Sequence, residues 1–130
     1  MNNLLKGKKI LVVEDDFSSK FYLNKVLEKS GAEVFNADNG RDAVELVRVT
    51  PEIELILMDL QMPVMDGYTA IKLIREFNTK VILIAQTAYG LIGDKEKILS
   101  SGFDDYLIKP ITYNQLVEKL VSFLGKNGQE

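Results

Sequence analysis

Acidic side chains follow two short apolar segments of this 130-residue sequence. Residues 14–16, Glu-Asp-Asp, come directly after residues 10–13, and Asp59 comes directly after residues 55–58. An uninterrupted apolar run is typical of a strand that is covered on both faces of a parallel sheet. In open α/β sheets, ligands bind outside the carboxyl ends of the strands. These acids are therefore candidate site residues, although each one alone could also belong to a turn or a helix cap.

A hydroxyl and an ammonium group take similar places after two later apolar segments. Thr87 follows residues 80–85 closely, and Lys109 follows residues 106–108. Carboxylate oxygens suit Mg²⁺, and a metal held by one or two carboxylates keeps coordination positions for phosphate oxygens. Hydroxyl and ammonium groups can bind phosphate oxygens as well. If these strand ends meet, their side chains indicate phosphoryl chemistry at a Mg²⁺ site.

The composition narrows the possible chemistry. The chain has no cysteine and no histidine, which excludes disulfides, zinc–thiolate sites, thiol nucleophiles and imidazole catalysis. Its net charge of −3 gives no basic field for nucleic acid. No apolar run approaches the roughly 20 residues of a membrane span, and the first residues lack a signal-peptide core. We therefore expect a soluble cytoplasmic protein without nucleic-acid or membrane partners.

Five apolar segments with the length of strands alternate with five segments of helical periodicity. Asp16 is placed to cap the first helix, and Gly31 and Gly125 are placed to end the first and the last. The helix at 91–101 has the least regular pattern, because Gly93 lies near its start, and we expect it to be short or loosely held. The expected strands are 10–13, 32–37, 55–58, 80–85 and 106–108, and the expected helices are 17–30, 41–49, 68–77, 91–101 and 112–124.

This alternation predicts a doubly wound α/β fold in one domain, with a core at about 8–124 and a tail at 125–130. For five strands we expect the flavodoxin-like parallel order 2-1-3-4-5, which places the ligand crevice between the first and third strands. Glu14, Asp15 and Asp59 then converge. Two unit charges about 4 Å apart repel by about 4 kcal/mol at an effective dielectric near 20, and a dication such as Mg²⁺ removes this repulsion.

These residues resemble the receiver domain of two-component response regulators over roughly residues 8–124. The resemblance rests on four segments in register, VVEDD at 12–16, MDLQMPVMDG at 58–67, QTA at 86–88 and DDYLIKP at 104–110. It implies a phosphoacceptor signalling domain rather than an enzyme, since such a domain assists only its own phosphorylation and dephosphorylation. The implied partner is a histidine kinase or a histidine phosphotransfer protein.

The resemblance implies roles for the acidic residues. Asp59 would take a phosphoryl group from the phosphohistidine of the partner. Asp15 and Asp59 would bind Mg²⁺ together with the backbone carbonyl of Gln61, and Glu14 would act mostly through water. The family has two acids where this chain has three. Spacing to the end of the first helix favours Glu14 and Asp15 as the pair with Asp16 as the cap, whereas a shift of one residue would pair Asp15 with Asp16.

The resemblance also implies which residues respond to phosphorylation and which surface binds a downstream protein. Thr87 and Lys109 would bind phosphoryl oxygens, and Thr87 and Tyr106 would form the switch. The Lys109–Pro110 peptide would be cis, as proline allows. A downstream protein would bind a surface made by the fourth helix, fifth strand and fifth helix. Because Lys109 lies at a strand end, we expect its ammonium to matter for signalling more than for folding.

Three other functions fit the residues less well. Phosphatases of the haloacid dehalogenase type also use an Asp nucleophile with Mg²⁺, but they need a second Asp two positions later, where this chain has Gln61. A degenerate receiver could serve only as an interaction module, but all the site residues are present. No glycine-rich loop follows the first strand, so nucleotide binding of the dinucleotide or P-loop kind is unsupported.

The sequence also gives an expectation about the kind of protein to which this domain belongs. No effector segment follows Gly125, so we expect either a stand-alone regulator or one receiver of a hybrid histidine kinase. Gln61, Tyr89 and the DKEK segment at 94–97 resemble hybrid-kinase receivers somewhat more.

Overall fold

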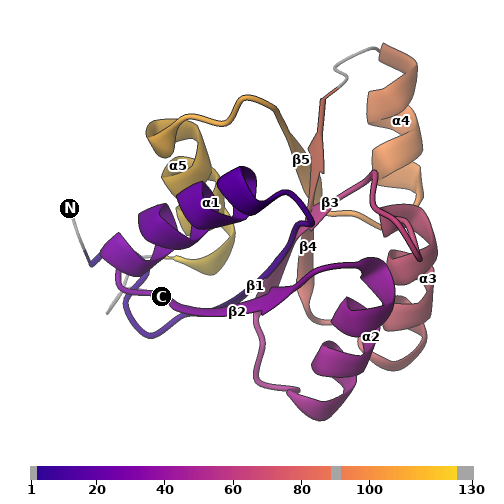
Figure 1. The fold of residues 1–130 in the computed structure, drawn as a ribbon, viewed down its shortest axis with the longest axis horizontal. Helices are drawn as coiled ribbons and strands as arrows, with labels where there is room; N and C mark the ends of the chain where they lie inside the picture. The colour runs from indigo at the N-terminus through magenta and orange to yellow at the C-terminus, as the bar shows by residue number, and fades with distance from the viewer. Residues whose placement is uncertain (1–2, 89–91, 126–130) are drawn as a thin grey trace.

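The computed structural model describes residues 3–88 and 92–125, and these residues form five strands and five helices in alternation (Figure 1). The elements are β1 (Lys9–Val13), α1 (Phe17–Lys29), β2 (Glu33–Ala37), α2 (Gly40–Val49), β3 (Leu55–Asp59), α3 (Gly67–Phe77), β4 (Ile82–Thr87), α4 (Ile92–Ser100), β5 (Asp105–Ile108) and α5 (Tyr113–Leu124). Every predicted strand and helix is confirmed. Tyr89, the first position of the predicted 91–101 helix, and positions 126–130 of the predicted tail lie outside the described residues.

The five strands form one parallel sheet in the order β2-β1-β3-β4-β5, which confirms the predicted flavodoxin-like topology. Helices α1 and α5 cover one face of this sheet, and α2, α3 and α4 cover the other (Figure 1). The direction of winding reverses at β1, because the chain places β2 on one side of it and β3 on the other. The carboxyl ends of β1 and β3 are therefore neighbours, at the place where open α/β sheets bind ligands.

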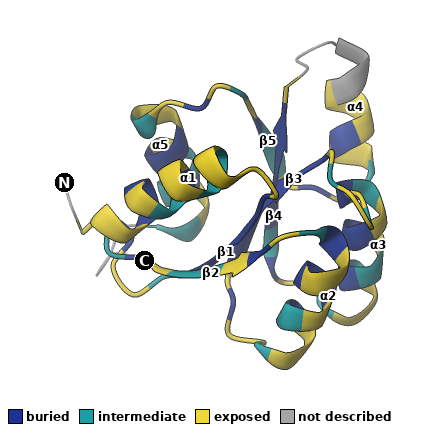
Figure 2. Ribbon diagram, viewed as in Figure 1, coloured by how far each residue is buried: buried dark blue, intermediate teal, exposed yellow. Residues whose placement is uncertain are grey.

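The core consists of two apolar layers, one on each side of the sheet (Figure 2). Alternate residues of β1 show the division, because Leu11 and Val13 pack in the layer with α2 and α3 while Ile10 and Val12 pack in the layer with α1 and α5. Both faces of the central strands are thus buried, which explains their apolar runs without polar alternation. None of the helices in the described ranges is long and apolar enough to cross a membrane.

The ends of the first helix follow the predicted capping chemistry. The side chain of Asp16 accepts a hydrogen bond from the backbone N–H of Ser19 at 2.8 Å, which satisfies one of the free donors of the first turn. Gly31 follows α1 with φ +94°, a conformation that favours glycine because it has no Cβ. The start of α1, directly after the acidic residues, is therefore fixed by its own cap.

The start of α2 packs against the loop that follows β3. The backbone N–H of Gly40 donates to the carbonyl of Met65 at 3.2 Å, and a Cβ at position 40 would lie 2.4 Å from the same oxygen. Only a glycine fits this approach without movement of the backbone. Gly40 therefore helps to place the loop that carries the residues after Asp59.

We expect Gly40→Ala to lower the free energy of unfolding by about 1–3 kcal/mol, because its Cβ must displace backbone atoms. Chemical denaturation measures this change. The control Arg41→Ala alters the exposed neighbour in the same turn and should change the free energy by less than about 0.5 kcal/mol. Equal stability of Gly40→Ala and wild type would contradict the close packing of this loop on α2.

Candidate functional site

Three acidic side chains from two paired strands meet at the carboxyl edge of the sheet. Glu14 and Asp15 follow β1, and Asp59 ends β3, which pairs with β1 up to Val13 and Met58. One carboxylate oxygen from each acid lies within 4.8 Å of the other two. Glu14 is 1% exposed and Asp59 is 7% exposed, whereas Asp15 is exposed. The structure thus brings together the acids that the sequence placed at this edge.

The third acid of the 14–16 run has a different place. Asp16 caps α1 through its bond from Ser19, and this hydrogen bond holds the pKa of the Asp16 carboxyl below its usual value. Glu14 instead turns inward and accepts from the backbone N–H of Asp16 at 3.1 Å. The geometry therefore agrees with Glu14 and Asp15 as the acidic pair and with Asp16 as the helix cap.

Lys109 supplies the positive charge of the cluster. Its Nζ lies 3.1 Å from Oδ2 of Asp59 and 3.4 Å from Oε1 of Glu14, and its side chain is only 29% exposed. The Lys109–Pro110 peptide is cis, as predicted. Removal of the Lys109 ammonium would leave two buried carboxylates without their cationic partner. The expectation that this ammonium matters for signalling more than for folding stays a prediction.

The protonation of the cluster reflects burial and crowding of charge. Burial raises the pKa of Glu14, the N–H of Asp16 opposes this shift, and the negative charge of Asp59 adds to it. Partial burial works against the charge of Lys109, but its hydrogen bond and ion pairs to Asp59 and Glu14 outweigh burial and raise its pKa. Lys109 therefore stays charged beside the carboxylates.

The donor set of this cluster fits a hard divalent cation. Three carboxylates face one ammonium among the described residues, so negative charge is left in excess even when Lys109 is counted. All the ligand atoms are oxygens, which suit Mg²⁺ and leave room for water or phosphate oxygens. Glu14, Asp15 and Asp59 are thus the side chains that could hold the metal.

A pocket of about 650 Å³ opens beside Asp59, and its lining includes Gln61, Thr87, Lys97 and Lys109. Gln61 donates its backbone N–H to Oδ1 of Asp59 at 3.1 Å. Thr87, at the end of β4, is buried, and its carbonyl accepts from the N–H of Lys109 at 2.8 Å. The predicted residues Gln61, Thr87 and Lys109 thus all lie around Asp59.

The loop after β3 is bent sharply beside the pocket. Val64 has φ +70°, and the N–H of Met65 donates to the carbonyl of Pro63 at 2.7 Å, which makes a γ-turn. A β-branched residue in this conformation is strained. Gly67 completes the loop, since a Cβ there would lie 3.0 Å from the carbonyl of Asp59. The sequence signalled a loop through its Pro, Asp and Gly residues, but gave no sign of the strained Val64.

Tyr106, the predicted switch residue, lies on β5 next to the strand that carries Thr87. It pairs in register with Ala85 of β4, and it is half-buried against the core layer of α2 and α3.

Two residues of the site were not predicted from the sequence. Lys97 and Tyr68 both line the pocket, and Nζ of Lys97 lies 4.5 Å from the ring centroid of Tyr68. A lysine and a tyrosine at ordinary helix positions carry no signal of such a contact.

The raised pKa of Glu14 gives a test by pH. Because the folded chain binds this proton more tightly than the unfolded chain, stability from Glu14 increases as the pH falls from its raised pKa toward 4.5. Glu14→Gln lacks the ionisable group. We expect its thermal midpoint in metal-free buffer to exceed that of wild type at neutral pH, with a difference that shrinks as the pH falls. Glu28→Gln, at an exposed position of α1, is the control, and a difference independent of pH would contradict this assignment.

Comparison with known proteins agrees with these observations. The family model described as response regulator receiver domain matches residues 10–121. The chain is 34% identical over 125 residues to the sensor histidine kinase GacS of Pseudomonas protegens, and this match covers 92% of the chain and 14% of the kinase. It is 35% identical over 118 residues to the probable transcriptional regulatory protein SilR of Salmonella typhimurium, with 91% of the chain and 51% of that protein covered. The chain thus spans about half or less of these relatives.

Solved structures give the same result. The receiver domain of a sensor histidine kinase from Pseudomonas aeruginosa, with a magnesium ion coordinated in its active-site cleft, is 35% identical with a TM-score of 0.85, and 92% of this chain and 99% of that one are covered. The receiver domain of Saccharomyces cerevisiae Ssk1, crystallised with the histidine phosphotransfer protein Ypd1, is 34% identical with a TM-score of 0.84, and 89% and 88% are covered. The chain belongs to the response regulator receiver domain family.

Proposed function

We propose that this domain is the phosphoacceptor of a two-component phosphorelay and that Asp59 takes the phosphoryl group from a partner's phosphohistidine. The observation that carries the proposal is the setting of Asp59, a buried carboxylate in a pocket, with Lys109 at 3.1 Å and two further acids beside it. Such a setting gives an oxygen nucleophile and a nearby positive charge for phosphoryl oxygens. Within this proposal the domain acts in the cytoplasm as a signalling module rather than as an enzyme.

Each residue of the site has a separate task in the transfer. An oxygen of Asp59 forms the new bond to phosphorus as the bond to the partner's imidazole nitrogen breaks, and the electron pair stays on that nitrogen. Lys109 and Thr87 bind phosphoryl oxygens. Asp15, Asp59 and the carbonyl of Gln61 would hold Mg²⁺, with Glu14 acting through water. Bound Mg²⁺ would offset the negative charge of the carboxylates and of the phosphoryl group.

The surface around the site suits a protein as the phosphodonor. Phe17 and Phe21 lie on the first turns of α1, directly after the acidic run, and they are 76% and 54% exposed with their rings stacked at 6.2 Å. Exposed aromatic pairs of this kind mark interaction surfaces. A groove of about 530 Å³ that is lined by Tyr22 and Lys109 continues from α1 toward the site. We infer that a histidine kinase or histidine phosphotransfer protein docks here.

A phosphatase function is less well supported. Two positions after Asp59 stands Gln61, whose amide cannot transfer the proton that a general acid must supply. Its exposed side chain and its backbone bond to Asp59 give it a place at the pocket but no acid–base role. The acyl phosphate is therefore expected to persist rather than to turn over quickly. The relatives include a sensor kinase and a transcriptional regulator, so the proposal covers a stand-alone regulator and a hybrid-kinase receiver.

For the output we propose a coupled movement of Thr87 and Tyr106. A phosphoryl group on Asp59 draws the hydroxyl of Thr87 toward it, and Tyr106 on the neighbouring strand fills the space behind. A groove between α4 and α5, lined by Tyr106, Leu99 and Lys119, is then the surface for a downstream protein. A shift from 1:99 to 99:1 needs about 5.5 kcal/mol, more than one hydrogen bond provides, so a partner that prefers the active surface completes the change.

Substitution of Asp59 tests the phosphoacceptor. We expect Asp59→Asn to abolish labelling by acetyl phosphate, whereas wild type should form a stable acyl phosphate only when Mg²⁺ is present. Asp66→Asn is the matched control, because it lies in the same loop and asparagine can still cap α3 as Asp66 does. Intact-protein mass spectrometry measures the label. Labelling of Asp59→Asn would show that another residue is the nucleophile, and rapid release of phosphate by wild type would favour the phosphatase.

A phosphoryl mimic tests the output. On addition of beryllofluoride and Mg²⁺, we expect NMR shift changes to spread from Asp59 to Thr87, Tyr106 and residues 95–101. Thr87→Ala should confine the changes to the acidic cluster, because the hydroxyl that responds to the phosphoryl group is gone. Thr69→Ala, at an exposed position of α3, is the control, because it leaves the site intact. Shift changes that never leave the acidic cluster in wild type would contradict the proposed switch.

A further inference from the structure

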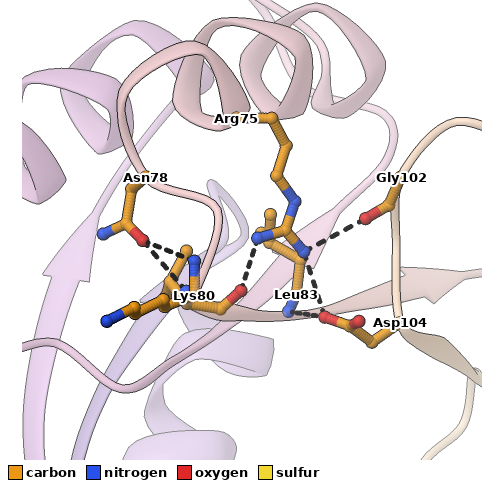
Figure 3. Close-up of polar contacts among 7 residues, drawn as sticks. Arg75, Asn78, Lys80, Leu83, Gly102 and Asp104 are labelled. Carbon is orange, nitrogen blue, oxygen red and sulfur yellow. Dashed lines mark hydrogen bonds and ion pairs between the residues drawn. The ribbon is translucent and has the colours of Figure 1, made fainter.

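Arg75, near the end of α3, binds two other segments of the chain at the same time (Figure 3). Its Nη1 donates to the carbonyl of Val81 at 2.6 Å, in the segment that leads into β4. Its Nη2 donates to the carbonyl of Gly102 at 3.1 Å and to Oδ2 of Asp104 at 3.0 Å, in the turn between α4 and β5. The guanidinium thus links α3 to the start of β4 and to the turn after α4.

Asp104 attaches the same turn to the sheet. Its Oδ2 accepts from the backbone N–H of Leu83 at 2.8 Å (Figure 3). Its own backbone N–H donates to the carbonyl of Leu83 at 2.7 Å. The side chain of Arg75 is 23% exposed, so its ion pair with Asp104 is partly shielded from water. Partly buried, charge-assisted hydrogen bonds of this geometry are stronger than exposed ion pairs. The turn after α4 is therefore bonded to α3 through Arg75 and to β4 through Asp104.

The body of α4 is attached less firmly. Among its described side chains, at positions 95–100, only Ile98 is buried. One polar contact of these described side chains with α3 is the ammonium of Lys97 over the ring of Tyr68, and both of these residues line the pocket of Asp59. Tyr68 also packs edge-on against Phe103, just after the helix, with ring centroids 6.2 Å apart. Among the described side chains, the turn at 101–104 is thus held more firmly than positions 95–100 of the helix.

We propose that Arg75 is a positioning residue that holds the end of α4 as a pivot, so that α4 responds to the site by swinging about Gly102. Gly102 has φ +112°, where a residue without Cβ accommodates a change of direction, and Ile71 and Arg75 lie beside it. The swing releases Lys97 from Tyr68 at the rim of the Asp59 pocket. The pivot is a property of the resting fold, while its use in signalling rests on the proposed phosphorylation of Asp59.

Hydrogen exchange of the resting chain tests the pivot without any ligand. In Arg75→Gln we expect the amides of residues 101–104 to exchange about tenfold faster or more, while the amides of β1 and β3 keep their rates. Arg48→Gln is the matched control, since Arg48 lies exposed on α2 with its guanidinium 4.5 Å from the ring of Phe77. Unchanged exchange at 101–104, or equal acceleration throughout the chain, would overturn the pivot.

Beryllofluoride then tests the use of the pivot. In wild type with Mg²⁺ we expect shift changes at Asp59, Thr87 and Lys97, and little change at Gly102 and Asp104. In Arg75→Gln the changes at Asp59 and Thr87 should persist, while those of α4 extend through Gly102 to Asp104. Wild-type changes at Gly102 and Asp104 as large as those at Lys97 would overturn the proposal.

The two experiments separate the possible failures. Absence of any wild-type response at Asp59 and Thr87 would contradict the phosphoacceptor function, and hydrogen exchange would still decide whether Arg75 holds the end of α4. A normal response in Arg75→Gln that stops before Gly102 would instead reduce Arg75 to a residue that only stabilises the fold, and would overturn its role as a pivot.

Discussion

The crowding of carboxylates at one point of the sheet is the constraint on which the rest of this structure depends. The pairing of β1 with β3 forces Glu14, Asp15 and Asp59 together, and burial of Glu14 and Asp59 denies them the screening that water would give. Lys109, which arrives from the end of β5, offsets part of the charge. The fold tolerates this repulsion because two apolar layers stabilise the sheet on both faces. The negative charge that Lys109 does not offset favours a bound cation at this cluster. It also favours ligands that bind together with a cation.

The architecture could be predicted from the sequence because its signals are local. Apolar runs of strand length, helical periodicity and capping residues such as Asp16 and Gly31 fix the elements, and chain connectivity then limits the order of the strands. The convergence of Glu14, Asp15 and Asp59 followed from that order alone. The position of the site could thus be predicted from the sequence.

Other features could not be predicted because they depend on distances between remote segments. Lys109 was predicted to lie at the site, but its direct contacts with two carboxylates, 50 and 95 positions away in the chain, were not predicted. Arg75 had the appearance of an ordinary basic residue in the last turn of a helix, where the dipole favours it. Its three acceptors come together only once α3 has packed beside β4 and the turn after α4. The positive φ of Val64 could not be predicted either, because β-branched residues rarely adopt this conformation.

Asp59 is the proposed phosphoacceptor of this domain. The most direct measurement is mapping of the acyl phosphate by mass spectrometry after reduction with borohydride, which converts only the modified aspartate. We expect conversion at position 59 in the presence of Mg²⁺ and a phosphodonor, and no conversion when Mg²⁺ is chelated. Conversion at Glu14 or Asp15, or none at all with a competent donor, would contradict this proposal.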